Sequence, residues 1–355
     1  MRILGHALTA MSTRSGRFPG HLERIRQGLS TVEVPSVPHN RWPLPSSSSP
    51  PHQSSHLNIS VLDSSFNPPT LAHLALANIH FSAAFRCTHN PQTPDCCRFH
   101  AKLLLLSVRN ADKSMKPGDA NYDQRVDMMA RLAHDVKNDT TPDHDDMDTF
   151  ISNEGRKRNY GYRTSNTAVA LIDEPTFVGK ARILLDFFHK RLSSMTSSNS
   201  VSAMTSDSPP NDNEALLTRD SRTILPELTF IVGIDTLERL FAPRYYLSEE
   251  DMHERLSHFL SPDGDNCRVI CARRVTPGLD AVSEDERERK VSEAAKSFID
   301  SNRIALVDIA DEVRSLSSSE TRAAILADPR HWTTTVTPSV AEYITQQNLY
   351  SPYPH

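Results

Sequence analysis

Short apolar runs that alternate with helical patterns constrain the fold of this chain more than any other feature. The runs occupy residues 57–63, 101–108, 167–173, 228–234, 267–273 and 304–310. Most are rich in β-branched residues and fit strands, and the run at 101–108 fits a strand or a buried helix. Helical patterns lie between most of them, as from Tyr122 to Val136. Because strands covered on both faces are apolar throughout, we expect an α/β fold with a doubly wound, mainly parallel sheet.

Composition sets the expected limits of the folded domain. The first 55 residues end in SVPHNRWPLPSSSSPPHQSS, which can neither propagate a helix nor fill a sheet. We therefore expect residues 1–55 to be a disordered tail and residues 56–350 to form the domain. Three segments interrupt the pattern and are interpreted as surface insertions: residues 86–100, 137–165 and 193–222. The last is a Ser/Thr/Asn/Asp tract and is expected to be disordered.

Charge and cysteine content argue against several classes of protein. A formal net charge of −5 gives no reason to expect nucleic acid or an anionic membrane as partner. No apolar run approaches the roughly 20 residues that span a bilayer. Five cysteines are too few and too unevenly spread for a disulfide framework, so the cytoplasm or nucleus fits best. The Arg- and Ser-rich N-terminus leaves a mitochondrial transit peptide open as an alternative to an ordinary tail.

The most informative segment is DSSFNPPTLAH, which runs from Asp63 to His73. It follows the first apolar run and leads into a helical pattern. In open parallel sheets, ligands bind outside the carboxyl ends of the strands, where helix N-termini offer N–H groups to phosphate. Adjacent prolines restrict the loop, and Thr70 and His73 are spaced to project from one helix face. We therefore expect one hydroxyl and one imidazole to share a phosphate site.

This segment resembles the GxFxPxHxGH signature of the nucleotidylyltransferase superfamily, in the SFNPPTxxH form typical of nicotinamide mononucleotide adenylyltransferases. The resemblance implies a Rossmann-like nucleotidylyltransferase fold. Thr70 and His73 fall on the two positions that contact ATP phosphates, so we expect both to be catalytic. Ser64 and Ala72 stand where the family has glycines. The residues before Thr70 are expected to bind ATP, namely Ser64, Ser65, Phe66 and Asn67.

A second motif, LSSSETR, runs from Leu316 to Arg322 after the last apolar run. Its spacing fits a helix-capping box with Ser317 as the N-cap and Glu320 three residues later. It also resembles the ISSTxIR motif of the adenylyltransferases, in which serine hydroxyls, helix N–H groups and one arginine hold the ATP β- and γ-phosphates. The resemblance implies a catalytic role for Arg322 and ATP-binding roles for Ser317, Ser318 and Ser319.

Weaker similarities to the same family lie between these two motifs. Arg125 opens an RxxM helix preceded by Lys113 in a loop where related enzymes receive the acceptor, so both are expected to bind the acceptor. A solvated helix face is the alternative for these two residues. Gly233 and Asp235 resemble a GxD element and are expected to bind ATP: Gly233 would let adenosine approach the backbone, and Asp235 would bond its ribose or cap the next helix. Two stretches, at residues 168–180 and 240–246, resemble a fungal subgroup of these proteins.

Other sites have weaker support in the sequence. Neither a GxxxxGK[ST] loop nor a GxGxxG turn is present, which argues against a P-loop ATPase or a dinucleotide-dependent dehydrogenase. The acidic run at 143–148 lacks the pattern of an EF-hand loop. The Cys/His group at residues 87–100 matches no common zinc spacing. We therefore expect no dedicated metal-binding residues.

Together these features predict an adenylyltransferase that joins AMP from ATP to a mononucleotide, with Mg²⁺ accompanying the ATP. The resemblance implies nicotinamide mononucleotide as the acceptor, giving NAD and pyrophosphate. Nicotinate mononucleotide and a phosphopantetheine acceptor remain open. A scaffold or regulatory protein that binds ATP with little catalysis is a second class of function, which the altered glycines and insertions permit. The oligomeric state is not readable from the sequence.

Overall fold

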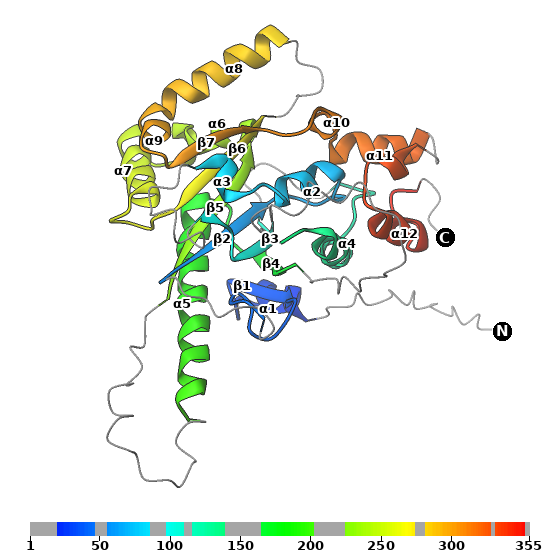
Figure 1. Cartoon of the computed structure of the whole chain (residues 1–355). Coiled ribbons are helices and arrows are strands. Elements are labelled where there is room, and N and C mark those ends of the chain that lie inside the picture. The colour runs from blue at the N-terminus through cyan, green and yellow to red at the C-terminus, as the bar shows by residue number, and fades with distance from the viewer. Residues whose placement is uncertain are drawn as a thin grey trace, which may run out of the picture.

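The structure is a computed structural model. It describes residues 20–46, 55–85, 97–109, 116–138, 165–201, 224–273, 281–327 and 331–351. These ranges form a central sheet with helices on both faces (Figure 1). Within them, no helix is long and apolar enough to cross a membrane.

The sheet has seven strands in the order β1-β4-β3-β2-β5-β6-β7. Their bounds are β1 Val32–Ser36, β2 His56–Asp63, β3 Ala101–Ser107, β4 Thr167–Ile172, β5 Leu225–Gly233, β6 Arg268–Arg273 and β7 Ile304–Asp308. Strands β2 to β7 are parallel to one another, and β1 is antiparallel to β4. All six predicted apolar runs are strands, which confirms the predicted α/β fold with a doubly wound, mainly parallel sheet.

The order of the parallel strands identifies where a ligand site is expected. Counted in chain order, the six parallel strands lie in the order 3-2-1-4-5-6, which is the Rossmann arrangement. The second and third of these strands extend the sheet on one side of the first strand, and the fourth to sixth extend it on the other side. These two strands, β2 and β5, are neighbours in the sheet. The crevice outside their carboxyl ends is therefore the expected place for a ligand.

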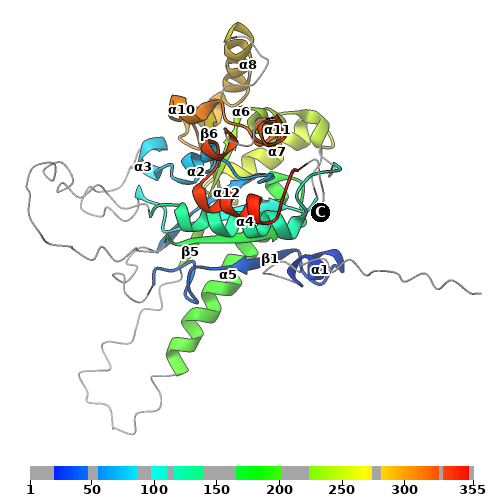
Figure 2. The ribbon, with the colours of Figure 1, turned by 90° about the vertical axis from the view of Figure 1, so that its right-hand side faces the viewer.

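Helices cover both faces of the sheet. They are α1 His21–Arg26, α2 Leu71–Ala77, α3 Phe81–Ala84, α4 Tyr122–Asp135, α5 Phe177–Val201, α6 Ile234–Leu240, α7 Glu249–Leu260, α8 Ala281–Ala294, α9 Lys296–Asp300, α10 Asp311–Arg314, α11 Ser318–Ala327 and α12 Pro338–Gln346, with 3₁₀ turns η4 Pro243–Tyr245 and η5 Trp332–Thr334. Alternate strand residues enter different cores: Leu103 and Leu105 pack with α5 and α7, whereas Leu104 and Leu106 pack with α2 and α4. A third apolar cluster joins α4, α11 and α12, and Figure 2 shows α12 lying against α4.

The prediction of a disordered tail over residues 1–55 is wrong for residues 20–46. Strand β1 pairs with β4 at the edge of the sheet. Trp42 is fully buried, packs 5.5 Å from the Phe188 ring, and accepts a hydrogen bond from Arg191 at its carbonyl. The prolines of this segment argued against a strand in the sequence analysis. Strand β1 nevertheless forms, because a five-residue edge strand tolerates a proline that a central strand would exclude.

The predicted insertions are also shorter than expected where the structure describes them. Helix α5 continues to Val201, nine residues into the tract expected to be disordered from residue 193. Phe99 and His100, placed in the first insertion, are buried, and His100 Nδ1 accepts a hydrogen bond from Asn58 N. Cys97 is disulfide-bonded, whereas Cys267 and Cys271 are free. Residues 86–96, 139–164 and 202–223 lie outside the described ranges.

Candidate functional site

The candidate site lies at the carboxyl ends of β2 and β5. Leu62 of β2 is paired with Ile231 of β5, so the loop that begins at Ser64 starts beside Gly233. The first motif leaves β2 and enters α2, and the predicted Gly233 and Asp235 leave β5 and enter α6. Both segments therefore open onto the crevice that the strand order predicts.

Thr70 and His73 lock the start of α2 together. Thr70 is the N-cap, and its backbone N–H donates to His73 Nδ1 at 3.0 Å. Because Nδ1 accepts from a backbone amide, the neutral ring carries its proton on Nε2. Nε2 lies 2.9 Å from the hydroxyl of Ser64. The structure thus brings three predicted site residues into one hydrogen-bonded group, with the His73 donor directed at the loop after β2.

Phe66 anchors the turn of this loop. Its backbone has a φ of 44°, in the left-handed region that bulky residues rarely adopt. The ring is fully buried, and its centroid lies 5.1 Å from that of His73. Burial of the ring therefore offsets the backbone strain and fixes the turn next to the imidazole.

The second motif begins α11 and confirms the predicted cap. Ser317 Oγ accepts a hydrogen bond from Glu320 N at 3.1 Å and donates to the Glu320 carboxylate at 2.9 Å. These contacts satisfy an exposed N–H group in the first turn of the helix. The Ser317 hydroxyl is thus engaged in the cap, and the predicted ATP-binding roles of Ser317, Ser318 and Ser319 stay predictions.

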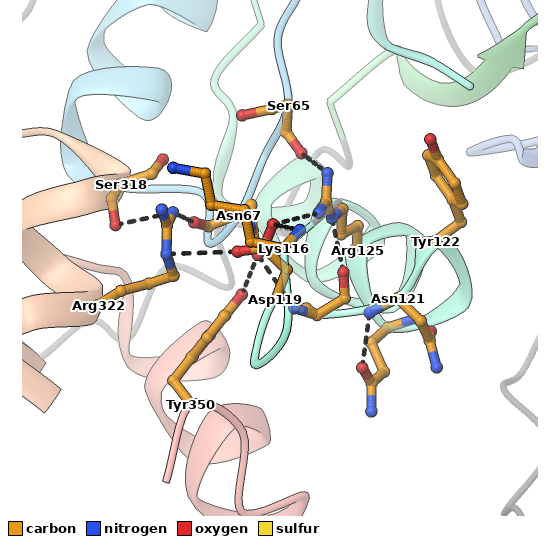
Figure 3. A network of polar contacts seen from close by, with 12 residues as sticks. Ser65, Asn67, Lys116, Asp119, Asn121, Tyr122, Arg125, Ser318, Arg322 and Tyr350 are labelled. Atoms are coloured by element: carbon orange, nitrogen blue, oxygen red, sulfur yellow. Dashed lines mark hydrogen bonds and ion pairs between the residues drawn. The ribbon is translucent and has the colours of Figure 1, made fainter. Parts of the chain in front are cut away.

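The two motifs are in direct contact. Ser318 Oγ donates to the carbonyl of Pro68 at 2.7 Å, and the guanidinium of Arg322 donates to the carbonyl of Asn67. The backbone of Leu71 also bonds to Thr335, close after α11. Segments about 250 residues apart in sequence therefore form one structural unit, drawn in Figure 3.

A carboxylate that the sequence did not single out lies between two guanidinium groups. Asp119 is 3.6 Å from Arg322 and 3.6 Å from Arg125. Burial alone would raise the pKa of Asp119, but hydrogen bonds from Lys116 N and Asn67 and the two nearby arginines lower it below its ordinary value. Asp119 is thus an anion at neutral pH and partly neutralises the cations of the site.

Arg125 occupies a different environment from the one expected. It is only 6% exposed, and its guanidinium donates to the carbonyls of Ala120 and Ser65 at 2.8 and 3.4 Å. Burial lowers its pKa, although Asp119 acts in the opposite direction. The structure therefore places Arg125 as a support beneath the Ser65 loop, where its guanidinium is enclosed by protein groups. The alternative of a solvated helix face is wrong for Arg125.

The remaining predicted residues vary in their surroundings. Gly233 is the N-cap of α6, and Asp235 is 3.4 Å from Arg239 on that helix. A cavity of about 370 Å³ adjoins them, lined by Ile234, the ends of β6 and β7, and residues of α8 and α10. Ser319 Oγ lies 3.5 Å from Arg322. Lys113, the other predicted acceptor contact, lies outside the described residues.

Two features at the site escaped sequence reasoning. Lys180 of α5 forms a buried ion pair with Asp63, the last residue of β2. Tyr350 donates a hydrogen bond to Asn67 Oδ1 at 2.8 Å. Lys180 ends the stretch at residues 168–180 that resembles the fungal subgroup, but nothing in that stretch indicated a contact with Asp63, and Tyr350 carried no signal. The chain after α12 also lines a cavity of about 330 Å³ with residues 118–120 and 124.

Metal ligands are sparse in the part of the chain that the structure describes. No group of three or more His, Cys, Asp or Glu side chains there could hold an ion. Most of the Cys/His group and the whole acidic run at 143–148 lie outside these ranges.

Comparisons with known proteins agree with the resemblance in the motifs. No protein-family model matches the chain. A protein of Schizosaccharomyces pombe named "Putative nicotinamide mononucleotide adenylyltransferase" is 24% identical over 304 residues, which cover 84% of this chain and 86% of that protein. The predicted resemblance to this group of proteins is thereby confirmed over most of the chain.

Solved structures with weaker similarity include two of Plasmodium falciparum nicotinic acid mononucleotide adenylyltransferase. The complex with NaAD is 14% identical with a TM-score of 0.39, and the complex with APC is 13% identical with a TM-score of 0.37. Each match covers 83% of this chain and 98% of the other. A Thermotoga maritima TmcAL structure bound with alpha-thio ATP is 10% identical with a TM-score of 0.30, and the match covers 82% of this chain and 56% of that one.

Proposed function

We propose that the chain is an adenylyltransferase that joins AMP from ATP to a mononucleotide and releases pyrophosphate. Nicotinamide mononucleotide is the proposed acceptor, which makes NAD the product. The single observation that carries the proposal is the contact of Ser318 and Arg322 with the loop that precedes Thr70 and His73. This contact gathers two phosphate-binding motifs around one crevice.

Charge compensation is the main demand of this reaction. ATP and a phosphomonoester bring several negative charges within a few ångströms of each other, so the site must supply cations and N–H donors. Arg322 is a partly exposed cation at the site, with 26% of its side chain accessible. The Nε2–H of His73, which lies beside Ser64, and backbone N–H groups in the first turn of α11 add neutral donors.

The proposed chemistry needs no nucleophile from the protein. An oxygen of the acceptor phosphate attacks the α-phosphorus of ATP in line, the bond to the β-phosphate oxygen breaks, and pyrophosphate leaves with that electron pair. Alignment and electrostatic stabilisation dominate catalysis of such transfers. In this proposal Thr70 and His73 orient the triphosphate, while Arg322 and the Ser317–Ser319 turn hold its β- and γ-phosphates.

Mg²⁺ is proposed to accompany ATP at this site. The ion is usually bound through substrate phosphates and water with one or two protein carboxylates, so it would be held chiefly by the ATP phosphates. When bound, Mg²⁺ would neutralise charge that develops on the departing pyrophosphate. The protein residues would bind and orient the ATP that carries it.

The similarity to the Schizosaccharomyces pombe protein supports the choice of acceptor. A panel assay tests this proposal. Purified protein with ATP and Mg²⁺ is offered nicotinamide mononucleotide, nicotinate mononucleotide or phosphopantetheine, and pyrophosphate is measured. Release that depends on nicotinamide mononucleotide supports the full proposal, whereas release with another acceptor supports only the reaction class. ATP binding without acceptor-dependent release would favour the scaffold alternative.

A further inference from the structure

The chain beyond α12 turns back toward the candidate site. Helix α12 ends at Gln346, and Asn348 adopts a left-handed conformation with a φ of 50°. Leu349 N then bonds to the carbonyl of Ile344, and Asn348 N bonds to that of Thr345. These two bonds form a Schellman motif, which reverses the chain direction at a helix end. Tyr350 follows directly and is thereby directed inward.

Two kinds of contact hold the Tyr350 side chain. Its ring is buried in the apolar cluster that joins α4, α11 and α12. Its hydroxyl donates to Asn67 Oδ1 at 2.8 Å, across 283 positions of sequence (Figure 3). Burial raises the pKa of Tyr350 well above its ordinary value, so the hydroxyl remains a donor over the whole physiological range.

Asn67 connects this hydroxyl to the cation of the site. The backbone N–H of Ala120 also donates to Asn67 Oδ1 at 3.3 Å, which fixes the orientation of the amide. The NH₂ group of the same amide then donates to Asp119, the carboxylate that faces Arg322. The carbonyl of Asn67 accepts a hydrogen bond from Arg322 itself. Besides Ser318 and Ser319, Arg322 therefore contacts two groups tied to Asn67: its own carbonyl and the Asp119 carboxylate that its amide orients.

We propose that Tyr350 is a positioning residue for the triphosphate site, which orients Asn67 and through it Arg322. The inference rests on the proposed function, because it assumes that Arg322 binds the phosphates of ATP. Tyr350 itself touches neither ATP nor acceptor in this account. Its effect on nucleotide binding is carried by the hydroxyl alone.

Tyr343 of α12, seven residues before Tyr350, provides a matched control. It is also buried, and its hydroxyl donates to Asp127 at 2.8 Å, away from the two motifs. Tyr350→Phe and Tyr343→Phe each delete one buried hydroxyl hydrogen bond and leave the ring. Any effect that comes only from loosening the C-terminal segment would appear in both variants.

The experiment measures ATP binding in the full chain by calorimetry, with the unfolding temperature of every variant recorded in parallel. Tyr350→Phe is expected to weaken ATP binding by roughly threefold to tenfold, the value of one net hydrogen bond. Tyr343→Phe is expected to lower the unfolding temperature and leave ATP binding unchanged. In an Asn67→Ala background, Tyr350→Phe is expected to cause no further loss of affinity.

Three results would overturn the inference. They are unchanged ATP binding in Tyr350→Phe, equal weakening in Tyr343→Phe, or a loss of ATP affinity on Tyr350→Phe that is as large in the Asn67→Ala background as in the wild type. A wild-type chain that does not bind ATP overturns both this inference and the proposed function. A chain that binds ATP but transfers nothing to any acceptor overturns the proposed function alone, and the affinity comparison still decides the role of Tyr350.

Discussion

The hydroxyl of Ser318 donates a hydrogen bond to the carbonyl oxygen of Pro68 over 2.7 Å. This bond links the first turn of α11 to the loop that enters α2. The two helix starts therefore have a fixed relation before any nucleotide arrives. A site that is arranged in advance loses less free energy on binding and can stabilise charge without reorganising.

His73→Ala is expected to reduce turnover by about 10² to 10³, the usual range for losing one donor to a developing charge. The folded state should lose about 1–3 kcal/mol, because Thr70 N and the Ser64 hydroxyl each lose a buried hydrogen-bond partner. Steady-state kinetics and urea denaturation measure the two effects separately. Undiminished turnover in a folded variant would show that His73 has no catalytic role.

Arg322→Gln is expected to raise the KM for ATP by at least tenfold, since a charge-assisted hydrogen bond to phosphate is worth about 1.5–3 kcal/mol. Arg289→Gln on α8 is the control, because Arg289 is 61% exposed and, among the described residues, pairs with Glu286 and Glu293 of its own helix. It should leave the KM unchanged. Equal KM values for the two variants would contradict the assignment of Arg322.

Lys180→Met is expected to destabilise the fold by roughly 3–5 kcal/mol, because it leaves the Asp63 carboxylate buried without its partner. The double variant Lys180→Met with Asp63→Asn should recover most of that loss, since no uncompensated charge remains. Urea denaturation of the single and double variants tests this coupling. A double variant no more stable than Lys180→Met would contradict it.

Asp119 should make stability depend on acid pH. Its folded-state pKa is lowered from an ordinary value of 3.8, so its contribution is complete above that pH. The contribution is lost as the pH falls below 3.8 through the lower folded-state pKa. The difference in unfolding free energy between wild type and Asp119→Asn should therefore narrow below this pH. A difference that is constant from neutral to acid pH would show that Asp119 titrates alike in both states.

Trp42→Ala is expected to cost about 3–5 kcal/mol, as for other buried tryptophans, because it opens a cavity against Phe188. The change tests whether residues 20–46 belong to the folded domain. Thermal unfolding compared with wild type measures it. An unchanged unfolding temperature would show that residues 20–46 do not stabilise the folded domain.

The sequence was most informative where local patterns decide structure. The runs that became β2 to β7 were recognisable because a buried parallel strand is apolar throughout. The cap at Ser317 was recognisable because Glu320 stands three residues later. Each of these signals is contained within a few consecutive residues, so it can be recognised without knowledge of the fold.

Long-range relationships were not readable in the same way. Strand β1 escaped notice because it has only five residues and lies among prolines, and its partner β4 follows 135 positions later. Tyr350 and Asp119 meet Asn67 only after the chain has folded, and no local spacing marks them. The burial of Arg125 likewise depends on carbonyl groups of other loops. These contacts are products of tertiary packing.

The position of the transferred phosphorus tests the central claim most directly. ATP labelled at the α-phosphate is incubated with the protein, Mg²⁺ and nicotinamide mononucleotide, in parallel with ATP labelled at the γ-phosphate. The account predicts that the α-label appears in the dinucleotide product and the γ-label in pyrophosphate. A γ-label released as orthophosphate, with no α-label in any product that contains the acceptor, would contradict it.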